Sequence, residues 1–184
     1  MRKLIAWNVV TLDGYFEGTT PWKLDFHETV WGPELEALSK EQLADLDYLL
    51  FGRKTYEGMA SYWTENADEG EIGKAMNAVP KLVASRTLKN VEWNNSTLID
   101  GDVGEAIPRL KAQDGRNIYV FGSADLLSTL TAEGLVDEYR ICIAPVLLGA
   151  GTPLFKPAEH KTSLKLIDAK ALTNGGVLMR YGMA

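Results

Sequence analysis

Cysteine, histidine and positive charge are scarce in this sequence of 184 residues. The single cysteine, Cys142, cannot form an internal disulfide, which is compatible with a reducing compartment, so we expect the protein in the cytoplasm. One cysteine and two histidines provide no zinc-ligand pattern, so no metal is expected. No apolar run approaches the roughly 18 residues that are needed to cross a bilayer, so no membrane association is expected.

The charge balance excludes another class of partner. Lysine and arginine number 19 against 25 aspartates and glutamates, which gives a formal net charge of −6. Proteins that bind nucleic acids usually carry a basic surface, so no nucleic-acid partner is expected. A few well-placed arginines and lysines can still bind a phosphorylated ligand on an acidic protein.

The remaining composition is typical of one folded domain that spans residues 1–184. Hydrophobic residues make up 46% of the chain and charged residues 24%, as in ordinary globular proteins. A chain of this length buries roughly 70% of its unfolded surface, which is enough for a core without disulfides.

Short apolar runs alternate with helical patterns along most of the chain. The continuously apolar runs 48–51 and 118–121 are typical of central strands that are covered on both faces, and each run stops at a glycine. The other expected strands are 4–10, 81–84, 139–143 and a C-terminal hairpin of 164–166 and 177–181 around the Asn-Gly turn at 173–176. Helices are expected from Pro33, from Arg53 or Lys54, after a capping box of Asp102 and Glu105, and after Ser123 as a cap. The pattern predicts an α/β fold whose sheet is mostly parallel with an antiparallel edge.

Two of the strand-to-helix junctions combine small and polar residues. The first junction is Gly52-Arg53-Lys54-Thr55 and the second is Gly122-Ser123-Ala124. Glycine lets a ligand approach the backbone, and the first N–H groups of a helix attract anions. Because ligands bind at the carboxyl ends of parallel strands, the two junctions together fit the two phosphates of a dinucleotide. Tight turns alone would also explain small residues at either junction, and neither matches the G-x-G-x-x-G pattern of a standard dinucleotide site.

A third strand end, at Ser85-Arg86, offers a hydroxyl and a guanidinium group. These groups suit the 2′-phosphate of NADPH, although a solvated surface arginine is the simpler interpretation of this dipeptide alone.

Taken together, these segments resemble the NADPH-binding segments of dihydrofolate reductase in order and spacing. Pro21-Trp22-Lys23-Leu24 likewise resembles that family's Pro-Trp-x-Leu segment beside the nicotinamide. Thr11-Leu12-Asp13-Gly14-Tyr15 and the stretch from Val136 to Gly151 are still more similar to the reductase domain of bifunctional riboflavin-biosynthesis proteins. The chain is therefore identified as a member of the dihydrofolate-reductase-like superfamily, closest to stand-alone riboflavin-biosynthesis reductase domains.

The resemblance implies a three-layer fold with a central, mostly parallel sheet of about eight strands, and it implies NADPH across the strand ends. The cofactor-binding residues that it implies are Ala6, Gly52, Arg53, Lys54, Thr55, Ser85, Arg86, Gly122, Ser123 and Ala124. A cis peptide is frequent at the last of these turns in the family, which makes cis geometry of Gly122-Ser123 an open alternative.

The resemblance assigns the substrate to Asn8, Asp13 and Trp22, and it leaves the proton donor open. Dihydrofolate reductase places a carboxylate about five residues after its tryptophan, but His27 stands there in this chain, with Glu28 next to it. Asp13 matches the aspartate of the riboflavin-reductase pattern, although an Asp-Gly pair also forms turns without any catalytic role. Asp13 and Glu28 are therefore the candidate catalytic residues, and Asp13 is the preferred one.

Three functions remain in competition. The first is NADPH-dependent reduction of a C=N bond or a ring-opened ribosylamino group, as in 5-amino-6-(5-phosphoribosylamino)uracil reductase. The second is reduction of dihydrofolate or another pterin, and the third is NADPH binding without catalysis. In each case the ligands are small, and a homodimer through the C-terminal edge strands is a further expectation.

Overall fold

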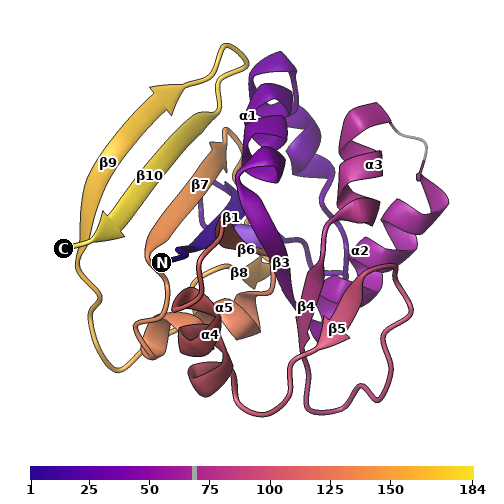
Figure 1. Cartoon of the computed structure of the whole chain (residues 1–184). Coiled ribbons are helices and arrows are strands. Elements are labelled where there is room, and N and C mark those ends of the chain that lie inside the picture. Colours follow the sequence, from indigo (N-terminus) through magenta and orange to yellow (C-terminus); the bar gives the residue numbers. More distant parts are fainter. Residues whose placement is uncertain (68–69) are drawn as a thin grey trace.

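In a computed structural model, described for residues 1–67 and 70–184, the chain forms an eight-stranded sheet in the order β5-β4-β3-β6-β1-β7-β10-β9 (Figure 1). Six neighbouring strands are parallel, and the last two, β10 and β9, run antiparallel, as predicted. The strands are β1 (Leu4–Thr11), β3 (Leu46–Gly52), β4 (Lys81–Ala84), β5 (Ser96–Leu98), β6 (Asn117–Phe121), β7 (Glu138–Ala144), β9 (Leu164–Ala171) and β10 (Val177–Met183). Two short strands, β2 (Tyr15–Glu17) and β8 (Thr152–Pro153), form a separate pair.

Helices cover both faces of the sheet, so the fold has three layers. One core cluster joins the sheet to α1 (Pro33–Ala44), α2 (Arg53–Glu65), α3 (Gly70–Ala78) and the short 3-10 helix η1 (Asp25–Thr29). The other cluster joins it to α4 (Val103–Lys111) and α5 (Ala124–Ala132). No described helix is long and apolar enough to cross a membrane.

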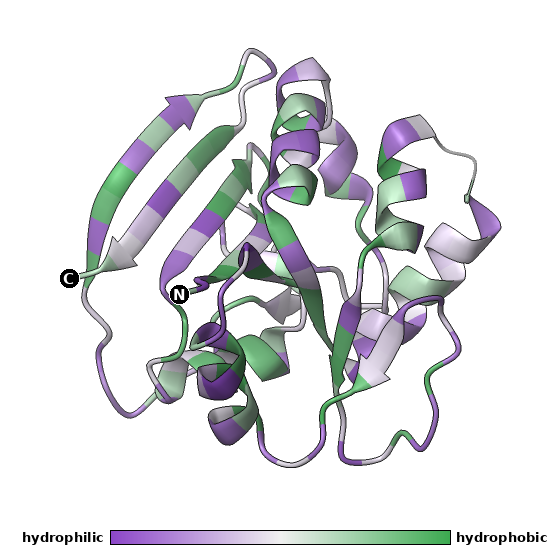
Figure 2. Cartoon of the chain, viewed as in Figure 1, coloured by the Kyte–Doolittle hydropathy of each residue, from purple (hydrophilic) through white to green (hydrophobic). Residues whose placement is uncertain are grey.

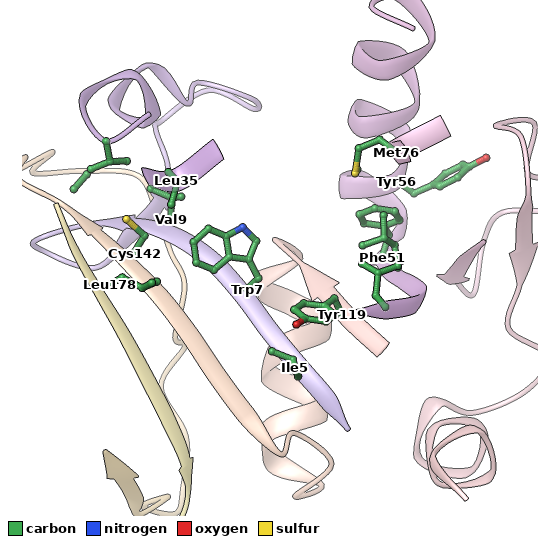
Figure 3. Close-up of a cluster of buried hydrophobic side chains, with 14 of the residues drawn as sticks. Ile5, Trp7, Val9, Leu35, Phe51, Tyr56, Met76, Tyr119, Cys142 and Leu178 are labelled. Atoms are coloured by element: carbon green, nitrogen blue, oxygen red, sulfur yellow. The ribbon is translucent and has the colours of Figure 1, made fainter. Parts of the chain in front are cut away.

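The central strand β1 supplies both core clusters by alternation of its side chains. Ile5, Trp7 and Val9 enter the cluster under α1 and α2, which Figure 3 shows beside Phe51 and Tyr119. Leu4, Ala6 and Val10 enter the cluster under α4 and α5. Burial on both faces explains why the strand has almost no polar residues except Asn8.

Parallel pairing brings the carboxyl ends of β3, β4, β6 and β1 to one edge of the sheet. Gly52 lies beside Ala84 in the pairing of β3 with β4, and Trp7 lies beside Phe121 in the pairing of β1 with β6. The junctions that the sequence singled out therefore share an edge, as the fold class requires.

Some local predictions differ from the structure. Asp102 does cap α4 through the backbone N–H of Gly104 at 2.7 Å, but the carboxylate of Glu105 lies by Arg109 instead of completing a capping box. The sequence analysis did not predict β2, β5, β8, α3 or η1, because these elements are short and lack a clear period.

The hairpin of β9 and β10 forms as predicted and extends the sheet beyond the helices. Gly175 in its turn adopts a φ of 92°, which a glycine accepts without strain. All eight residues of β9 are exposed, and its hydrophobic and hydrophilic residues alternate as coloured bands in Figure 2.

A buried charge cluster ties β7 to β10. The carboxylate of Glu138 is only 2% exposed and accepts hydrogen bonds from Arg140 at 2.7 Å and from Arg180 at 2.8 Å. Burial alone would raise the pKa of Glu138, but the hydrogen bonds from Arg180 and Arg140 outweigh it and lower the pKa below its usual value. The arginines therefore hold the carboxylate in its charged form.

We predict that Glu138→Gln lowers the free energy of unfolding at neutral pH by about 3 kcal/mol, because it leaves two partly buried guanidinium groups without their anion. The folded-state pKa lies below the unfolded one, so this stabilisation is complete above roughly pH 4.3 and is lost as the pH falls through the folded pKa. Urea unfolding at pH 7 and at pH 3 checks both statements. The exposed Glu105→Gln is the control, and an equal effect of the two substitutions would contradict the prediction.

Candidate functional site

A cleft of about 1320 Å³ opens at the carboxyl edge of the sheet. It runs from the β3–α2 and β6–α5 junctions, past the loop between β2 and η1, to the facing sides of α1, α2 and α3. Ten of the predicted site residues line it: Asn8, Trp22, Glu28, Gly52, Arg53, Lys54, Thr55, Gly122, Ser123 and Ala124.

The two strand-to-helix junctions are joined directly. The backbone N–H of Gly52 donates a hydrogen bond of 2.9 Å to the Oγ of Ser123. A methyl group added at Gly122 would lie 3.2 Å from Cγ2 of Thr55, so the second turn packs closely on the first turn of α2. The starts of α2 and α5 therefore form one concave surface, which we call the cradle.

The backbone of the cradle has the shape of an anion site. Gly122 and Ser123 both adopt positive φ values, of 58° and 62°, so successive peptide groups turn inward. Within the described part of the chain, neither α2 nor α5 receives a hydrogen bond from a side chain at its N-cap position. The first N–H groups of both helices are thus left for water or for an anionic ligand.

One expectation for this turn is corrected, and one open alternative is decided. Ser123 was predicted to cap α5, but its hydroxyl instead accepts the bond from Gly52 on the neighbouring junction. The Gly122-Ser123 peptide is trans, as is every peptide bond in the residues that the structure describes. Two consecutive left-handed residues make the turn without a cis bond.

Positive charge around the cradle comes from three side chains that line the cleft. Arg53 forms an ion pair of 3.1 Å with Glu57 one turn along α2, and Lys54 is exposed. Lys156 forms an ion pair with Asp125 in the first turn of α5. Lys156 was not predicted, because nothing near it in the sequence indicates that its loop returns to the β6–α5 junction.

Ser85 and Arg86 lie at the same edge but are not among the described residues that line the cleft. They follow Ala84, which pairs with Gly52, so Arg86 stands one strand away from Arg53. The Oγ of Ser85 accepts hydrogen bonds from the N–H groups of Thr87 and Leu88, and the side chain of Arg86 is exposed.

Trp22 closes the cleft over α2. Its backbone has a φ of 64° and donates a hydrogen bond of 2.9 Å to the carboxylate of Glu17. Its indole covers Gly58 so closely that a methyl group there would overlap the ring. Neither Glu17 nor Gly58 was singled out in the sequence, because their role depends on this contact.

Asn8, His27 and Glu28 line the next part of the cleft. Asn8 is 4% exposed, and no acceptor in the described residues lies within hydrogen-bond distance of its Nδ2. Burial lowers the pKa of His27 to about 4, so its imidazole is neutral at physiological pH. Glu28 follows on the same turn of η1 with an exposed side chain.

Asp13 has another environment. Its carboxylate accepts hydrogen bonds from the Thr11 hydroxyl at 2.6 Å and from the N–H groups of Leu148 at 3.1 Å and Gly149 at 2.8 Å. These bonds, the Thr11 hydroxyl first, lower its pKa. Neither Asp13 nor Ala6 is among the described residues that line the cleft, and Ala6 is fully buried. The geometry of Asp13 is that of a residue that fixes the loop after β7.

The fold of the chain is that of dihydrofolate reductases. The chain superposes on dihydrofolate reductase from Enterococcus faecalis, solved with NADP(H), with a TM-score of 0.64 and 13% identity over 98% of this chain and 96% of that one. At this identity the likeness shows the fold alone. Groups of three or more potential metal ligands are absent from the described residues.

The family follows from the sequence match. The model of the RibD C-terminal domain matches residues 2–178, and the chain belongs to this family. It is 32% identical to the uncharacterized protein YyaP of Bacillus subtilis (strain 168), over 98% of this chain and 94% of that protein. A Shewanella sp. PV-4 protein proposed to serve in riboflavin biosynthesis has a TM-score of 0.81 and 25% identity, over 99% of both chains.

The contact of Trp22 with Gly58 predicts that the effect of Gly58→Ala on the free energy of unfolding changes sign when Trp22 is removed. Gly58→Ala should lower the free energy of unfolding by about 1–2 kcal/mol, because the indole must leave its place. In a Trp22→Ala background the same substitution should raise stability by up to about 1 kcal/mol, since alanine favours a helix over glycine. Urea unfolding of the four proteins measures this. Equal effects of Gly58→Ala in both backgrounds would rule the contact out.

Proposed function

We propose that the protein is an NADPH-dependent reductase that passes hydride to a C=N bond or a ring-opened ribosylamino group of a small heterocycle. The observation that carries the proposal is the cradle, in which the Gly52–Ser123 hydrogen bond places two uncapped helix starts side by side. A dinucleotide has two adjacent phosphates, and each helix start suits one of them. The neighbour from Enterococcus faecalis, solved with NADP(H), supports the same choice of cofactor.

The residues of the cradle fit the polar part of NADPH. Lys54, Thr55 and the Gly122-Ser123-Ala124 turn would hold the pyrophosphate through backbone N–H groups and one cation. Gly52, whose own N–H is bonded to Ser123, would let the phosphates approach the backbone. Arg53 and Arg86, at the ends of neighbouring strands, would hold the 2′-phosphate, because guanidinium groups bind phosphate with paired hydrogen bonds. NADPH, when bound, supplies the hydride.

The proton that accompanies hydride transfer needs a donor in the cleft. We assign this role to Glu28, whose exposed carboxyl group lines the same cleft as Asn8 and Trp22. Asp13, the other candidate, has its oxygens occupied by the loop after β7 and a lowered pKa, so it is a poor proton donor. We propose that Asp13 supports the site through that loop.

Reduction of dihydrofolate or another pterin is the second candidate function. Glu28 in the cleft favours it, since a carboxylate near this position could bind a protonated ring. His27 counts against it, because a neutral imidazole stands where that family has its carboxylate. Substrate-dependent NADPH oxidation with pyrimidine and pterin substrates separates the two functions. Tight NADPH binding without oxidation of any of them would indicate a binding protein instead.

We predict that Arg86→Ala weakens NADPH binding about tenfold or more and leaves NADH binding unchanged, because only NADPH has the 2′-phosphate. Calorimetric titration of both nucleotides measures this, with the exposed Arg109→Ala on α4 as the control. An equal loss for NADPH and NADH, or no loss for either, would contradict the placement of the 2′-phosphate.

We also propose that two copies of the chain pair through the hairpin. β9 is an edge strand with all its residues exposed, and Leu166 and Leu164 share one face with their partners Tyr181 and Met183. Leu166 is 53% exposed and Met183 45%. An exposed apolar edge strand invites pairing, and an identical strand offers the same apolar face in return.

Leu166→Lys is expected to shift the protein from dimer to monomer, because it places a charge in the apolar contact. Light scattering after gel filtration measures the mass at matched concentrations. Leu147→Lys, at another exposed leucine outside the hairpin, is the control. A wild-type monomer, or a dimer that survives Leu166→Lys, would exclude this interface.

A further inference from the structure

The cleft has two regions of different chemistry. The cradle region has Arg53, Lys54 and Lys156 around two helix starts, with Glu57 and Asp125 as the ion-pair partners of Arg53 and Lys156. The opposite region, which we call the aromatic half, lies between η1, α1 and the facing sides of α2 and α3. If the cradle holds the cofactor, the aromatic half is left for the substrate.

The aromatic half is acidic. Glu28, Glu36 and Glu71 line it, and Lys40 is the one cation among its described lining residues. The Nζ of Lys40 forms ion pairs of 3.0 Å with both Glu36 and Glu71, so its charge is already balanced twice. These two carboxylates raise the pKa of Lys40, first through their hydrogen bonds and then through their charge. Neutral His27 adds no positive charge.

Large aromatic side chains are exposed inside this region. Trp31 is 53% exposed, Tyr62 is 47% exposed and Trp22, at the boundary with the cradle, is 38% exposed. Trp63 packs edge-on against Tyr62 with ring centroids 4.9 Å apart. Aromatic rings exposed in a cleft favour stacking with a flat ring, and their faces attract a cation rather than an anion.

Asn8 gives an independent indication of a ligand. It is a 96%-buried amide at the floor of the cleft, as its 4% exposure implies, and its Nδ2 has no acceptor among the described residues. A buried amide without a partner costs free energy, which a hydrogen-bond acceptor on a ligand would recover. The carbonyl oxygens and ring nitrogens of a flat heterocycle are acceptors of this kind, so a ligand can satisfy Asn8 without a phosphate.

We infer that the substrate is a flat heterocycle that is uncharged or cationic and carries no phosphate group. The inference rests on the proposed function, because it takes the cradle to be occupied by NADPH. Glu28, Glu36 and Glu71 would repel a dianionic phosphate in the aromatic half, and Lys40 has no charge to spare for it. The enzyme would therefore act on a dephosphorylated ribitylamino or ribosylamino heterocycle, or on a bare ring, rather than on a phosphorylated one.

Riboflavin and riboflavin 5′-phosphate are matched probes, because they share one flat ring and differ only in the phosphate. Their binding to the protein saturated with NADPH is followed by flavin fluorescence. We expect riboflavin to bind at least about fivefold more tightly than its phosphate at low ionic strength. The double variant Glu36→Gln/Glu71→Gln should reduce or reverse the ratio of the two dissociation constants, because it removes two negative charges and frees Lys40. Glu41→Gln, on the same helix but outside the lining of the cleft, should leave the ratio unchanged.

Three results would overturn the inference: tighter binding of the phosphate by the wild type, no binding of either probe, or a double variant with an unchanged ratio. Failure of the proposed function is recognised separately, because NADPH itself would then not bind. NADPH affinity of each variant also shows whether the protein has folded.

Discussion

The hydrogen bond from the N–H of Gly52 to the Oγ of Ser123 is the interaction on which the site depends. It joins two strand-to-helix junctions that are 71 residues apart in the chain. Parallel pairing of β3 with β6 brings the strand ends together, but this bond fixes how the two helix starts face each other. Without it, each start would be an ordinary weak anion site; with it, their N–H groups form one surface that fits two linked phosphates.

The rest of the cleft follows from the position of this cradle. Trp22 covers α2 at Gly58, one turn beyond Thr55, and so forms the boundary between the cofactor region and the aromatic half. The balance of charge differs across that boundary. The cradle has Arg53, Lys54 and Lys156 against Glu57 and Asp125, whereas the aromatic half has three glutamates against Lys40. A protein with a net charge of −6 can bind a polyanionic cofactor when a few of its cations, here Arg53, Lys54 and Lys156, lie together with two helix starts at one strand edge. The carboxylates elsewhere then select against a second anion.

Sequence patterns predicted the sheet and its edge, because strands and the glycines that end them follow from residues close together in the chain. The apolar runs 48–51 and 118–121 became β3 and β6, and the glycine after each became the start of the cleft. Contacts between distant segments do not follow in this way. The hydroxyl of Ser123 turned to Gly52 instead of capping α5, Lys156 reached α5 from a late loop, and the carboxylate of Asp13 was taken up by the loop after β7. In each case a polar side chain bonds to a residue that is distant in the sequence, and only the fold determines which residue that is.

The central claim is that the two helix starts hold the cofactor pyrophosphate together. Amide chemical shifts in an assigned spectrum of the protein, recorded during titration with NADPH, test it most directly. The account predicts large, saturating shifts at Lys54 and Thr55 and at Gly122, Ser123 and Ala124, all with one dissociation constant. The account would be contradicted if chemical-shift changes were confined to one of the two helix starts, or if the changes at both starts failed to saturate.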